Sequence, residues 1–504
     1  MTTALEKDPT TALEKDVAAP TGRRGSHALR WWVLAVLGVA QLMVVLDATV
    51  VNIALPHAQA DLGFSNGDRQ WVITGYALAF GSLLLLGGRL SDLFGRRTTF
   101  ITGLVGFAVA SAVGGAAGNF EVLVGSRVAQ GVFAALLAPA ALSLLTVTFT
   151  EPAERAKAFG IFGAIAGAGG ALGLLLGGAL TEWASWRWVM YVNLVFAAVA
   201  LVGAIMLLAK HTATERPKLD LPGTLTVTAA LFGIVYGFSH AESDGWTNGV
   251  TLFFLIGGVV LLGVFAWLEQ RVAHPLLPLR VVLDKTRGAS YVTVFTIGIG
   301  MFAMFLFLTY YMQQQLGYSP IRTGVAFLPM VAGMIASSTT VPALLIPRVG
   351  PKVTVVSGFL LATLGMALLT RIGVDTAYAS HILPSLILMG LGLGMAMSTA
   401  FSGATSGIDH RDAGVASAMV NTSQQVGGSI GTALLSTLAS TAFSDYVSGH
   451  VPPSPAVLAE ASVRSYTTTF WWAAAIFVVG AVITGIVMPN KVPVPAEGEP
   501  VLAH

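Results

Sequence analysis

The chain is a series of long apolar segments separated by short polar or Pro/Gly-rich breaks. A membrane-crossing helix needs about twenty mainly apolar residues, and the apolar windows predict about fourteen such spans. The seventh and eighth, residues 224–238 and 250–267, are shorter and flank a hydrophilic segment, residues 240–249. The pattern therefore predicts an all-α polytopic membrane protein. The predicted spans are centred near Val39, Ala79, Ala108, Ala134, Gly170, Ala200, Leu231, Val259, Ala303, Ala332, Leu361, Leu388, Ser429 and Val479.

The composition supports a membrane protein. Of the 504 residues, 55% are hydrophobic and 10% are charged, whereas roughly 25% are charged in soluble proteins. A soluble chain of this kind would need several large cores and almost no charged surface. Cysteine is absent, which excludes disulfides, thiolate metal sites and cysteine nucleophiles. The scattered Lys and Arg residues give no basic stripe, so we expect no nucleic-acid partner.

The distribution of Lys and Arg predicts the orientation. Most of the 27 basic residues fall in the tails and in the even-numbered loops, so both termini are expected to be cytoplasmic. Residues 1–29 are polar and contain a near-direct repeat, which predicts a disordered cytoplasmic tail. Residues 490–504 form a second cytoplasmic tail. The apolar stretch from Trp31 is too long for a signal peptide and should remain as the first span.

A repeated loop indicates two related halves. The segment Gly88–Phe100 (GRLSDLFGRRTTF) joins spans two and three, and a degenerate copy begins at Ala343 between spans ten and eleven. Gly95 matches Gly350 in this alignment. The placement predicts an internal repeat with spans seven and eight inserted between the halves. The expected organisation is an N-terminal six-helix bundle (30–210), two inserted helices (211–270), a cytoplasmic linker (271–288) and a C-terminal six-helix bundle (289–489).

Two charged residues lie inside predicted spans. Asp47 lies about sixteen residues beyond Trp31, roughly 24 Å along a helix that crosses about 30 Å. Arg127 lies roughly 9 Å from the outer end of span four. These similar depths predict that the carboxylate and the guanidinium pair inside the bundle, which relieves their desolvation cost. The pair could be static packing, or protonation of Asp47 could release it and bias alternating access.

Three motifs together resemble the major facilitator superfamily, specifically its fourteen-span drug:proton antiporter branch. The cytoplasmic loop, the first span and the fourth span each carry one motif, and the likeness extends from Trp31 to about Pro489. The motifs are Gly88-x-Leu90-x-Asp92-x-x-Gly95-Arg96-Arg97, Leu46-Asp47-x-Thr49-x-x-Asn52-x-Ala54-Leu55-Pro56, and Arg127-x-x-Gln130-Gly131 with Pro139.

The resemblance implies a fold and roles for several residues. The implied fold is the major facilitator fold with 14 transmembrane helices, two six-helix bundles plus two extra inserted helices. Asp47 and Arg127 would couple proton movement to transport. Charges near the helix ends also predict a cytoplasmic gate comprising Asp92, Gly95, Arg96 and Arg97, with Asp92 as the switch, whereas Arg96 and Arg97 could instead serve to fix the topology. In the fifth span, Gly170 and Leu174 stand where this branch tends to have prolines. The glycine spacing still permits close helix approach. Without proline at these two positions, the sequence does not predict the helix bend that proline imposes.

Polar and aromatic residues inside the spans are candidates for substrate contact. On the first helix, Gln41 and Asn52 share a stripe that points away from Asp47. Span nine mixes methionine, aromatic and amide side chains suited to loosely shaped or cationic ligands. Span thirteen carries a polar stripe, for which interhelical hydrogen bonding is an equal alternative. The candidate substrate-binding residues are Gln41, Asn52, Gln130, Phe305, Tyr310, Gln314, Asn421 and Gln425.

The predicted function is proton-driven export of hydrophobic or cationic drugs and toxic compounds by alternating access. The proton gradient supplies the energy, and we expect no cofactor, no metal and no enzymatic activity, because no zinc-protease, nucleophile-elbow or phosphate-loop pattern occurs. The expected partners are lipophilic small molecules, protons and the lipid bilayer, with a monomer in the bacterial inner membrane. The alternatives are a dedicated exporter of one endogenous metabolite or antibiotic, a proton-coupled importer, and a non-transporting membrane enzyme or receptor.

Overall fold

The computed structural model describes residues 23–65, 68–149, 151–208, 220–272, 275–404, 406, 408, 413–450 and 454–490. Over these residues the chain is helical without strands, which confirms the predicted all-α class. Thirteen of the described helical segments are long and apolar enough to cross a membrane. α5 is also long, and its second half contains the apolar segment Leu172–Trp183.

The helix bounds follow in chain order. The first six are α1 (Arg23–Leu62), α2 (Gln70–Phe94), α3 (Arg96–Gly115), α4 (Phe120–Thr148), α5 (Pro152–Trp183) and α6 (Trp188–Leu207). Next come α7 (Leu221–Asp244), α8 (Gly249–Glu269) and the short α9 (Leu279–Val282). The last are α10 (Lys285–Tyr310), the π-helical turn η1 (Tyr311–Gln315), α11 (Pro320–Leu344), α12 (Ile346–Leu369), the π-helical turn η2 (Tyr378–Ile382), α13 (Leu383–Ala404), α14 (Ala413–Ser448) and α15 (Pro455–Val487).

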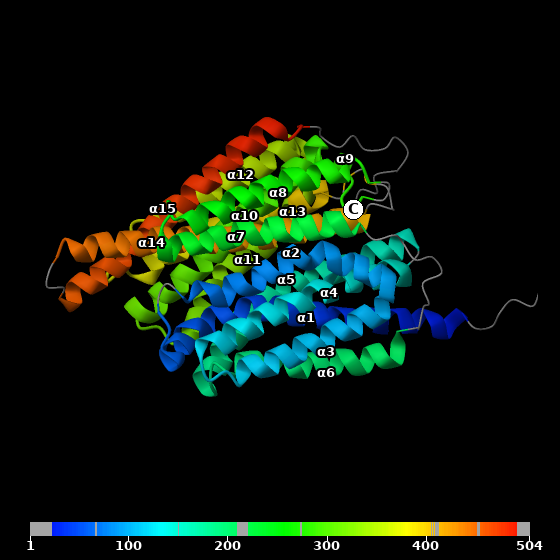
Figure 1. The fold of residues 1–504 in the computed structure, drawn as a ribbon, viewed down its shortest axis with the longest axis horizontal. Helices are drawn as coiled ribbons and strands as arrows, with labels where there is room; N and C mark the ends of the chain where they lie inside the picture. The colour runs from blue at the N-terminus through cyan, green and yellow to red at the C-terminus, as the bar shows by residue number, and fades with distance from the viewer. Residues whose placement is uncertain are drawn as a thin grey trace, which may run out of the picture.

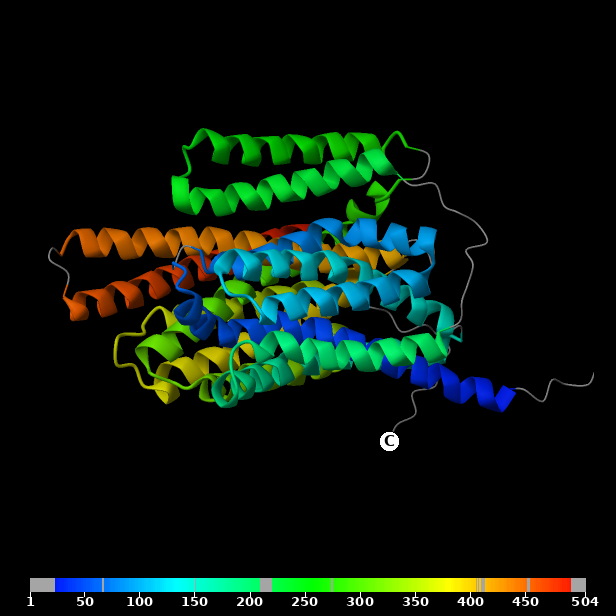
Figure 2. The ribbon, with the colours of Figure 1, turned by 60° about the horizontal axis from the view of Figure 1, so that its bottom comes forward.

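The long helices lie side by side along one common direction (Figure 1). α1 packs against α5 and α6, and α4 packs against α2 and α3. α10 packs against α13, α14 and α15, and α12 packs against α13 and α15. The α7–α8 pair lies along one flank of the bundle (Figure 2), where α7 contacts α14 and α2. We call the end that carries the α2–α3 turn the inner end and the opposite end the outer end.

The structure describes only part of each predicted tail. α1 begins at Arg23, so residues 23–29 are helical and the predicted disordered tail was too long at this boundary. Residues 1–22 and 491–504 lie outside the described residues, and with them most of both predicted tails. The predicted linker, residues 271–288, contains α9 and the first turn of α10.

The inserted helices are longer than the hydropathy pattern predicts. The hydrophilic segment 240–249 was expected to separate them, but α7 continues to Asp244 and only Gly245–Asn248 separates it from α8. Two local features explain the extension. His240 Nε2 lies 3.3 Å from the Asp244 carboxylate one turn later, and Gly245 ends the helix at a φ of 84°. Asn248 then caps α8 by accepting a hydrogen bond from the Val250 N–H at 2.8 Å.

The two copies of the repeated loop share one backbone conformation. Gly95 has a φ of 90° and Gly350 has a φ of 82°. Each separates two helices: Gly95 lies between α2 and α3, and Gly350 forms the kink at the start of α12. Residues with a side chain rarely adopt a positive φ, so the match of Gly95 with Gly350 has a conformational reason in both halves.

The glycines of the fifth span allow close packing. Gly169, Gly173 and Gly177 recur every four residues and face α1. A Cβ atom at Gly177 would lie 2.9 Å from the Val50 Cα atom, too close for any other residue. α5 is a single helix from Pro152 to Trp183. The close approach predicted from the glycine spacing is therefore present without a proline.

We expect Gly95→Ala to lower the free energy of unfolding by about 1 kcal/mol or more, because alanine at a positive φ is strained. Thermal unfolding of the purified protein in detergent measures the change. Gly125→Ala is the control, because Gly125 is an exposed glycine of α4 with open space around it. The control should be neutral or stabilising. Equal destabilisation by both changes would contradict the role assigned to the Gly95 turn.

Candidate functional site

A buried ion pair lies inside the bundle formed by the first six helices. The Arg127 Nη1 atom of α4 lies 2.5 Å from the Asp47 Oδ2 atom of α1. The side chains are 0% exposed for Asp47 and 2% exposed for Arg127. The pairing predicted from the depths of the two residues is thus present. Because the surroundings have a low dielectric constant, each buried charge needs the other to offset its desolvation cost.

Two amide side chains complete the hydrogen bonding of Asp47. Its Oδ1 atom accepts hydrogen bonds from Gln130 Nε2 at 3.0 Å and from Asn193 Nδ2 of α6 at 2.7 Å. Gln130 Nε2 also donates to Ser111 Oγ of α3 at 2.7 Å. The Gln130 Oε1 atom accepts from Arg127 Nη1 at 2.7 Å. We call these five side chains (Asp47, Ser111, Arg127, Gln130 and Asn193) the polar network.

Arg127 also connects the polar network to α2. Its Nε atom donates to the carbonyl oxygen of Val72 at 3.1 Å. Its guanidinium lies 4.4 Å from the centroid of the buried Tyr76 ring, a distance typical of a cation–π contact. The guanidinium is therefore fixed by a carboxylate, an amide, a backbone carbonyl and an aromatic ring from three helices.

The donor set around Asp47 determines what protonation would require. Both carboxylate oxygens accept hydrogen bonds, from one guanidinium and two amides. These donors suit the ionised carboxylate. A protonated Asp47 would turn its O–H toward one of these donors, so the polar network would have to rearrange. Protonation of Asp47 would therefore require side chains on several helices to move.

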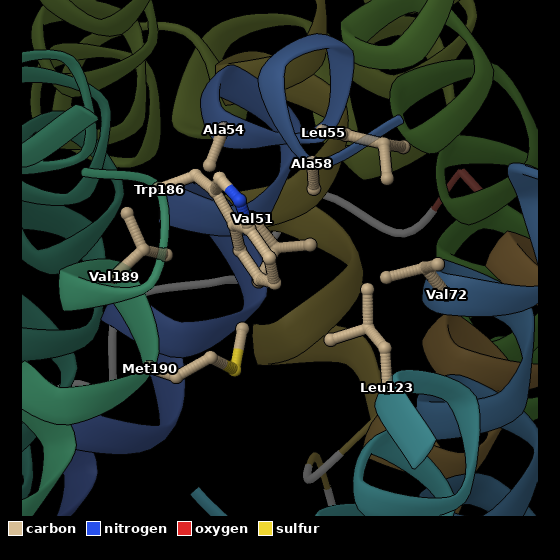
Figure 3. Close-up of a pocket in the computed structure, with 9 residues that line it drawn as sticks. All are labelled: Val51, Ala54, Leu55, Ala58, Val72, Leu123, Trp186, Val189 and Met190. Carbon is tan, nitrogen blue, oxygen red and sulfur yellow. The ribbon is translucent and has the colours of Figure 1, made fainter. Parts of the chain in front are cut away.

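An apolar cavity separates the polar network from the outer end. It has a volume of about 10 Å³ and is bordered only by apolar groups (Figure 3). Val51, Leu123 and Met190 border it about one turn outward of Asp47, Arg127 and Asn193 on the same helices. A water molecule needs roughly 10–15 Å³ and two to four polar partners, and this lining offers no polar surface to bind one. Its lining residues are Val51, Ala54, Leu55, Ala58, Val72, Leu123, Trp186, Val189 and Met190.

Contacts across the two halves close the outer end. Tyr310 of α10 donates its hydroxyl to Gln59 Oε1 of α1 at 2.6 Å. Gln313 Nε2 donates to the carbonyl oxygen of Ile53 at 3.0 Å. Arg69, which is buried at the start of α2, lies 4.2 Å from the centroid of the Tyr310 ring. α1 therefore carries Asp47 of the polar network and Gln59 of this outer closure. α2 carries the Val72 carbonyl that binds Arg127 and begins directly after Arg69 of the closure.

A second pair of helices closes the same end. The Ile321 N–H at the start of α11 donates to Glu182 Oε2 at the end of α5 at 3.0 Å. Gly178 of α5 lies against the Ile321 backbone, and Gly324 of α11 lies against the backbone of Leu174. These glycines let the two helices approach closely. Both contacts belong to the outer halves of α5 and α11.

The structure disperses the residues predicted to contact substrate. Gln130 belongs to the polar network, where both ends of its amide are bound by protein groups. Asn52 is buried and donates to the Ala48 carbonyl of its own helix at 3.0 Å. Tyr310 lies in the outer closure. Their substrate contact stays a prediction.

The other predicted substrate residues differ in exposure. Gln41 and Asn421 are half-buried, and Gln314 is exposed in the π-helical turn η1. Phe305 is buried with its ring centroid 5.0 Å from that of Phe327. Gln425 of α14 is buried beside Gly81 of α2, so it lies where the two halves meet.

The predicted cytoplasmic gate is described in part. The Asp92 side chain lies outside the described residues. Gly95 forms the positive-φ turn, and Arg96 is half-buried. Arg97 Nη2 donates to the Ile205 carbonyl near the end of α6 at 3.1 Å. In this conformation Arg97 joins α3 to α6 of the same half, and a gating role stays a prediction.

Three members of the site were missed from the sequence. Asn193 and Ser111 bind Asp47 and Gln130, and Tyr76 packs on Arg127. Asn193 had a usable signal, because it is the only amide in the apolar helix WVMYVNLVFAAVALVGAIML. A buried amide in a membrane requires a polar partner. Ser111 and Tyr76 carried no such signal, because both residue types are common in packed helices.

Comparisons with known proteins agree with this architecture. A family model described as Major Facilitator Superfamily matches residues 37–432. The chain is 48% identical to the puromycin resistance protein pur8 of Streptomyces alboniger, over 93% of each chain. It is 36% identical to the cephamycin export protein CmcT of Amycolatopsis lactamdurans, over 84% of this chain and 87% of that protein. It is 35% identical to the tetracenomycin C resistance and export protein of Streptomyces glaucescens, over 86% of this chain and 80% of that protein.

A solved structure shares the fold. The crystal structure of the nucleoside transporter NupG superposes with a TM-score of 0.62, covering 90% of this chain and 98% of that chain. Its sequence is 10% identical to this chain, so the likeness concerns the fold alone.

We expect Arg127→Leu to lower the free energy of unfolding by about 3–5 kcal/mol, because Asp47 would remain buried without its cation. The double variant Asp47→Asn/Arg127→Leu should lose less, since no charge remains buried. Chemical unfolding of the purified protein measures both. Arg371→Leu, at an exposed arginine, should change stability by no more than about 0.5 kcal/mol. A double variant that loses as much stability as Asp47→Asn and Arg127→Leu lose together, each measured alone, would contradict mutual charge compensation.

Proposed function

The chain belongs to the Major Facilitator Superfamily and is a multi-pass membrane transporter, and we propose that it exports hydrophobic or cationic drugs and toxic compounds in exchange for protons. The observation that carries the proton coupling is the buried polar network, in which Asp47 is the one carboxylate and is fully hydrogen-bonded. The names of the three relatives, which refer to resistance to or export of antibiotics, support the choice of substrate class.

Proton binding at Asp47 would release Arg127. Asn193 offers a route for this step, because its Oδ1 atom has no hydrogen-bond partner among the described residues. Rotation of the Asn193 amide would turn Oδ1 toward a protonated Asp47 and supply an acceptor for the new O–H. The carboxyl group would then be neutral and hydrogen-bonded, and Arg127 would lose its counter-ion. Protonation of Asp47 would thus replace one hydrogen-bonded arrangement of its carboxyl group with another.

The released arginine would act on the outer closure through α1 and α2. α1 carries Asp47 and also Gln59, which binds Tyr310 of the other half. α2 carries the Val72 carbonyl that binds Arg127, and its first turn follows Arg69. A shift of these two helices relative to α10 would break the Tyr310 contacts and open the outer end. Opposite binding preferences of proton and substrate for the two conformations would couple their movements.

The proposed orientation places the inner end in the cytoplasm of a bacterial cell, with the polypeptide in the inner membrane. The support is the concentration of Lys and Arg in the loops of that end. The proton gradient would supply the energy, without a cofactor. A protein acting as a monomer would suffice, because all members of the polar network come from one chain.

A dedicated exporter of one antibiotic is the second candidate. The names of the relatives favour it, since each of the three refers to a single antibiotic. Puromycin is therefore the first compound to test, alongside tetraphenylphosphonium as a simple lipophilic cation. Transport of puromycin alone would favour the dedicated exporter, and transport of both would favour a broad one.

Proteoliposomes with an acidic interior test the coupling. Export against protons predicts that the wild type accumulates puromycin or the lipophilic cation while protons leave. We expect Asp47→Asn to reduce this gradient-driven accumulation by about 5- to 150-fold, the range produced by a coupling free energy of about 1–3 kcal/mol. The reason is that asparagine cannot take up and release the proton.

Glu460→Gln provides the matched control, because Glu460 is an exposed acid near the start of α15. The control variant should transport like the wild type. Normal gradient-driven transport by Asp47→Asn would refute the role of Asp47. Accumulation driven only by a gradient of the opposite direction, in vesicles of known protein orientation, would indicate a proton-coupled importer.

A further inference from the structure

A second pair of buried acidic residues lies at the inner end of the two inserted helices. Asp220 caps the start of α7, and Glu269 is the last residue of α8. Their exposures are 3% and 4%. Acidic side chains are almost never fully buried unless they are paired. Neither residue belongs to the polar network around Asp47, so their burial needs its own explanation.

Each carboxyl group has one bound oxygen and one unbound oxygen. Asp220 Oδ1 accepts from the Gly223 N–H at 2.9 Å, and Glu269 Oε2 accepts from the Leu277 N–H at 2.9 Å. Asp220 Oδ2 and Glu269 Oε1 are buried and have no hydrogen-bond partner among the described residues. Both atoms border the small space beside the Gly223 Cα atom, and the two side chains are within hydrogen-bonding reach of each other.

The neighbouring cations in the described part of the chain are engaged elsewhere. Arg89 of α2 donates to the Pro275 carbonyl at 3.4 Å, and the Arg271 guanidinium stacks on the Trp267 ring at 4.3 Å. Arg287 of α10 donates to the Val281 carbonyl at 3.0 Å. The charged residue of α14, Asp445, lies at the opposite end of that helix. Within the described residues, no basic side chain therefore bonds the two unbound oxygens.

Two ionised carboxylates cannot share such a space without a cation. Their repulsion in a low-dielectric site is strong, and each unbound oxygen would also lack a donor. One proton solves both problems, because it neutralises one carboxyl group and donates a hydrogen bond to the other. Carboxyl pairs that hold one proton in this way are known from proteins in which two acids lie in contact.

We propose that Asp220 and Glu269 share one proton at neutral pH and form a second protonation site, separate from Asp47. The shared proton holds the start of α7 to the end of α8 and, through the Leu277 N–H, to the segment Pro275–Pro278. Loss of this proton leaves two adjacent negative charges and separates these elements. The Arg89 contact with Pro275 connects the pair to α2, the helix that also carries Val72 and Tyr76, which contact Arg127 of the polar network.

Infrared difference spectroscopy of the full chain in lipid nanodiscs tests the proposal. A protonated carboxyl group has a C=O stretching band that a carboxylate lacks. We expect the wild type to show such a band at neutral pH. Glu269→Gln and Asp220→Asn should each lose the part of this band that comes from the shared proton. Both changes keep the side-chain shape, and asparagine still caps a helix. Glu460→Gln at the exposed site should leave the band unchanged.

The outcomes separate clearly. A band that is absent from the wild type at neutral pH, or that stays unchanged in both folded variants, would overturn the shared proton. A band lost in Asp47→Asn but kept in Glu269→Gln would assign the proton to Asp47 instead, and would also overturn the proposal of a shared proton. The measurement requires no transport, so its failure and a failure of the proposed export are independent results.

The pH dependence of thermal unfolding gives a second measurement. A group that holds its proton more tightly in the folded state contributes stability at low pH that is lost as the pH rises. The stability of the wild type should therefore fall as the pH rises from the pKa of an unfolded carboxyl group, about 4, to the pH at which the pair releases its proton. In Glu269→Gln this loss should be smaller, because the amide can donate to Asp220 Oδ2 at every pH. Equal pH slopes in the wild type and in Glu269→Gln would contradict the proposal.

Discussion

A buried charge in a membrane has to find its partners inside the protein, and this constraint organises the first six helices. Water cannot stabilise Asp47, so a guanidinium and two amides do so. Arg127 and Gln130 belong to α4 and Asn193 belongs to α6. Arg127 also contacts Val72 and Tyr76 of α2, and Gln130 also contacts Ser111 of α3. The relative positions of α1, α2, α3, α4 and α6 are therefore tied to one ionised carboxylate. An apolar cavity borders the pair on its outer side.

The same constraint explains how a small chemical change can move large elements. In the proposed mechanism, adding one proton to Asp47 would remove the counter-ion of Arg127, and the bundle would have to supply another arrangement for a buried cation. α1 and α2 would transmit that change, because α1 carries Gln59 and α2 follows Arg69, and both residues contact Tyr310 in the other half. Elsewhere in this interface, glycines allow α5 and α11 to meet backbone to backbone. The interface therefore combines a few polar contacts with close backbone packing.

Particular residues show how much of the structure could be predicted from the sequence. The depth argument identified the Asp47–Arg127 pair because the helical rise converts residue number directly into depth in the membrane. The match of Gly95 with Gly350 identified two equivalent turns because a positive φ restricts the residue type. Gln130 was expected to contact substrate, yet it binds Asp47, because a sequence motif does not reveal which neighbour a side chain faces. The segment 240–249 was expected to be a separator, but α7 continues through the His240–Asp244 contact beyond the apolar run and ends at Gly245.

The sequence by itself determined the membrane class, the all-α fold, the internal repeat and the pair of opposite charges at one depth. These features depend on hydropathy, length and local backbone preference, which are properties of contiguous residues. Only the tertiary structure decided which helices surround Asp47, that Asn193 and Ser111 join the polar network, and that Asp220 and Glu269 face the same space beside Gly223. These contacts join residues far apart in the chain, and their partners depend on helix rotation and packing, which one-dimensional periodicity does not specify.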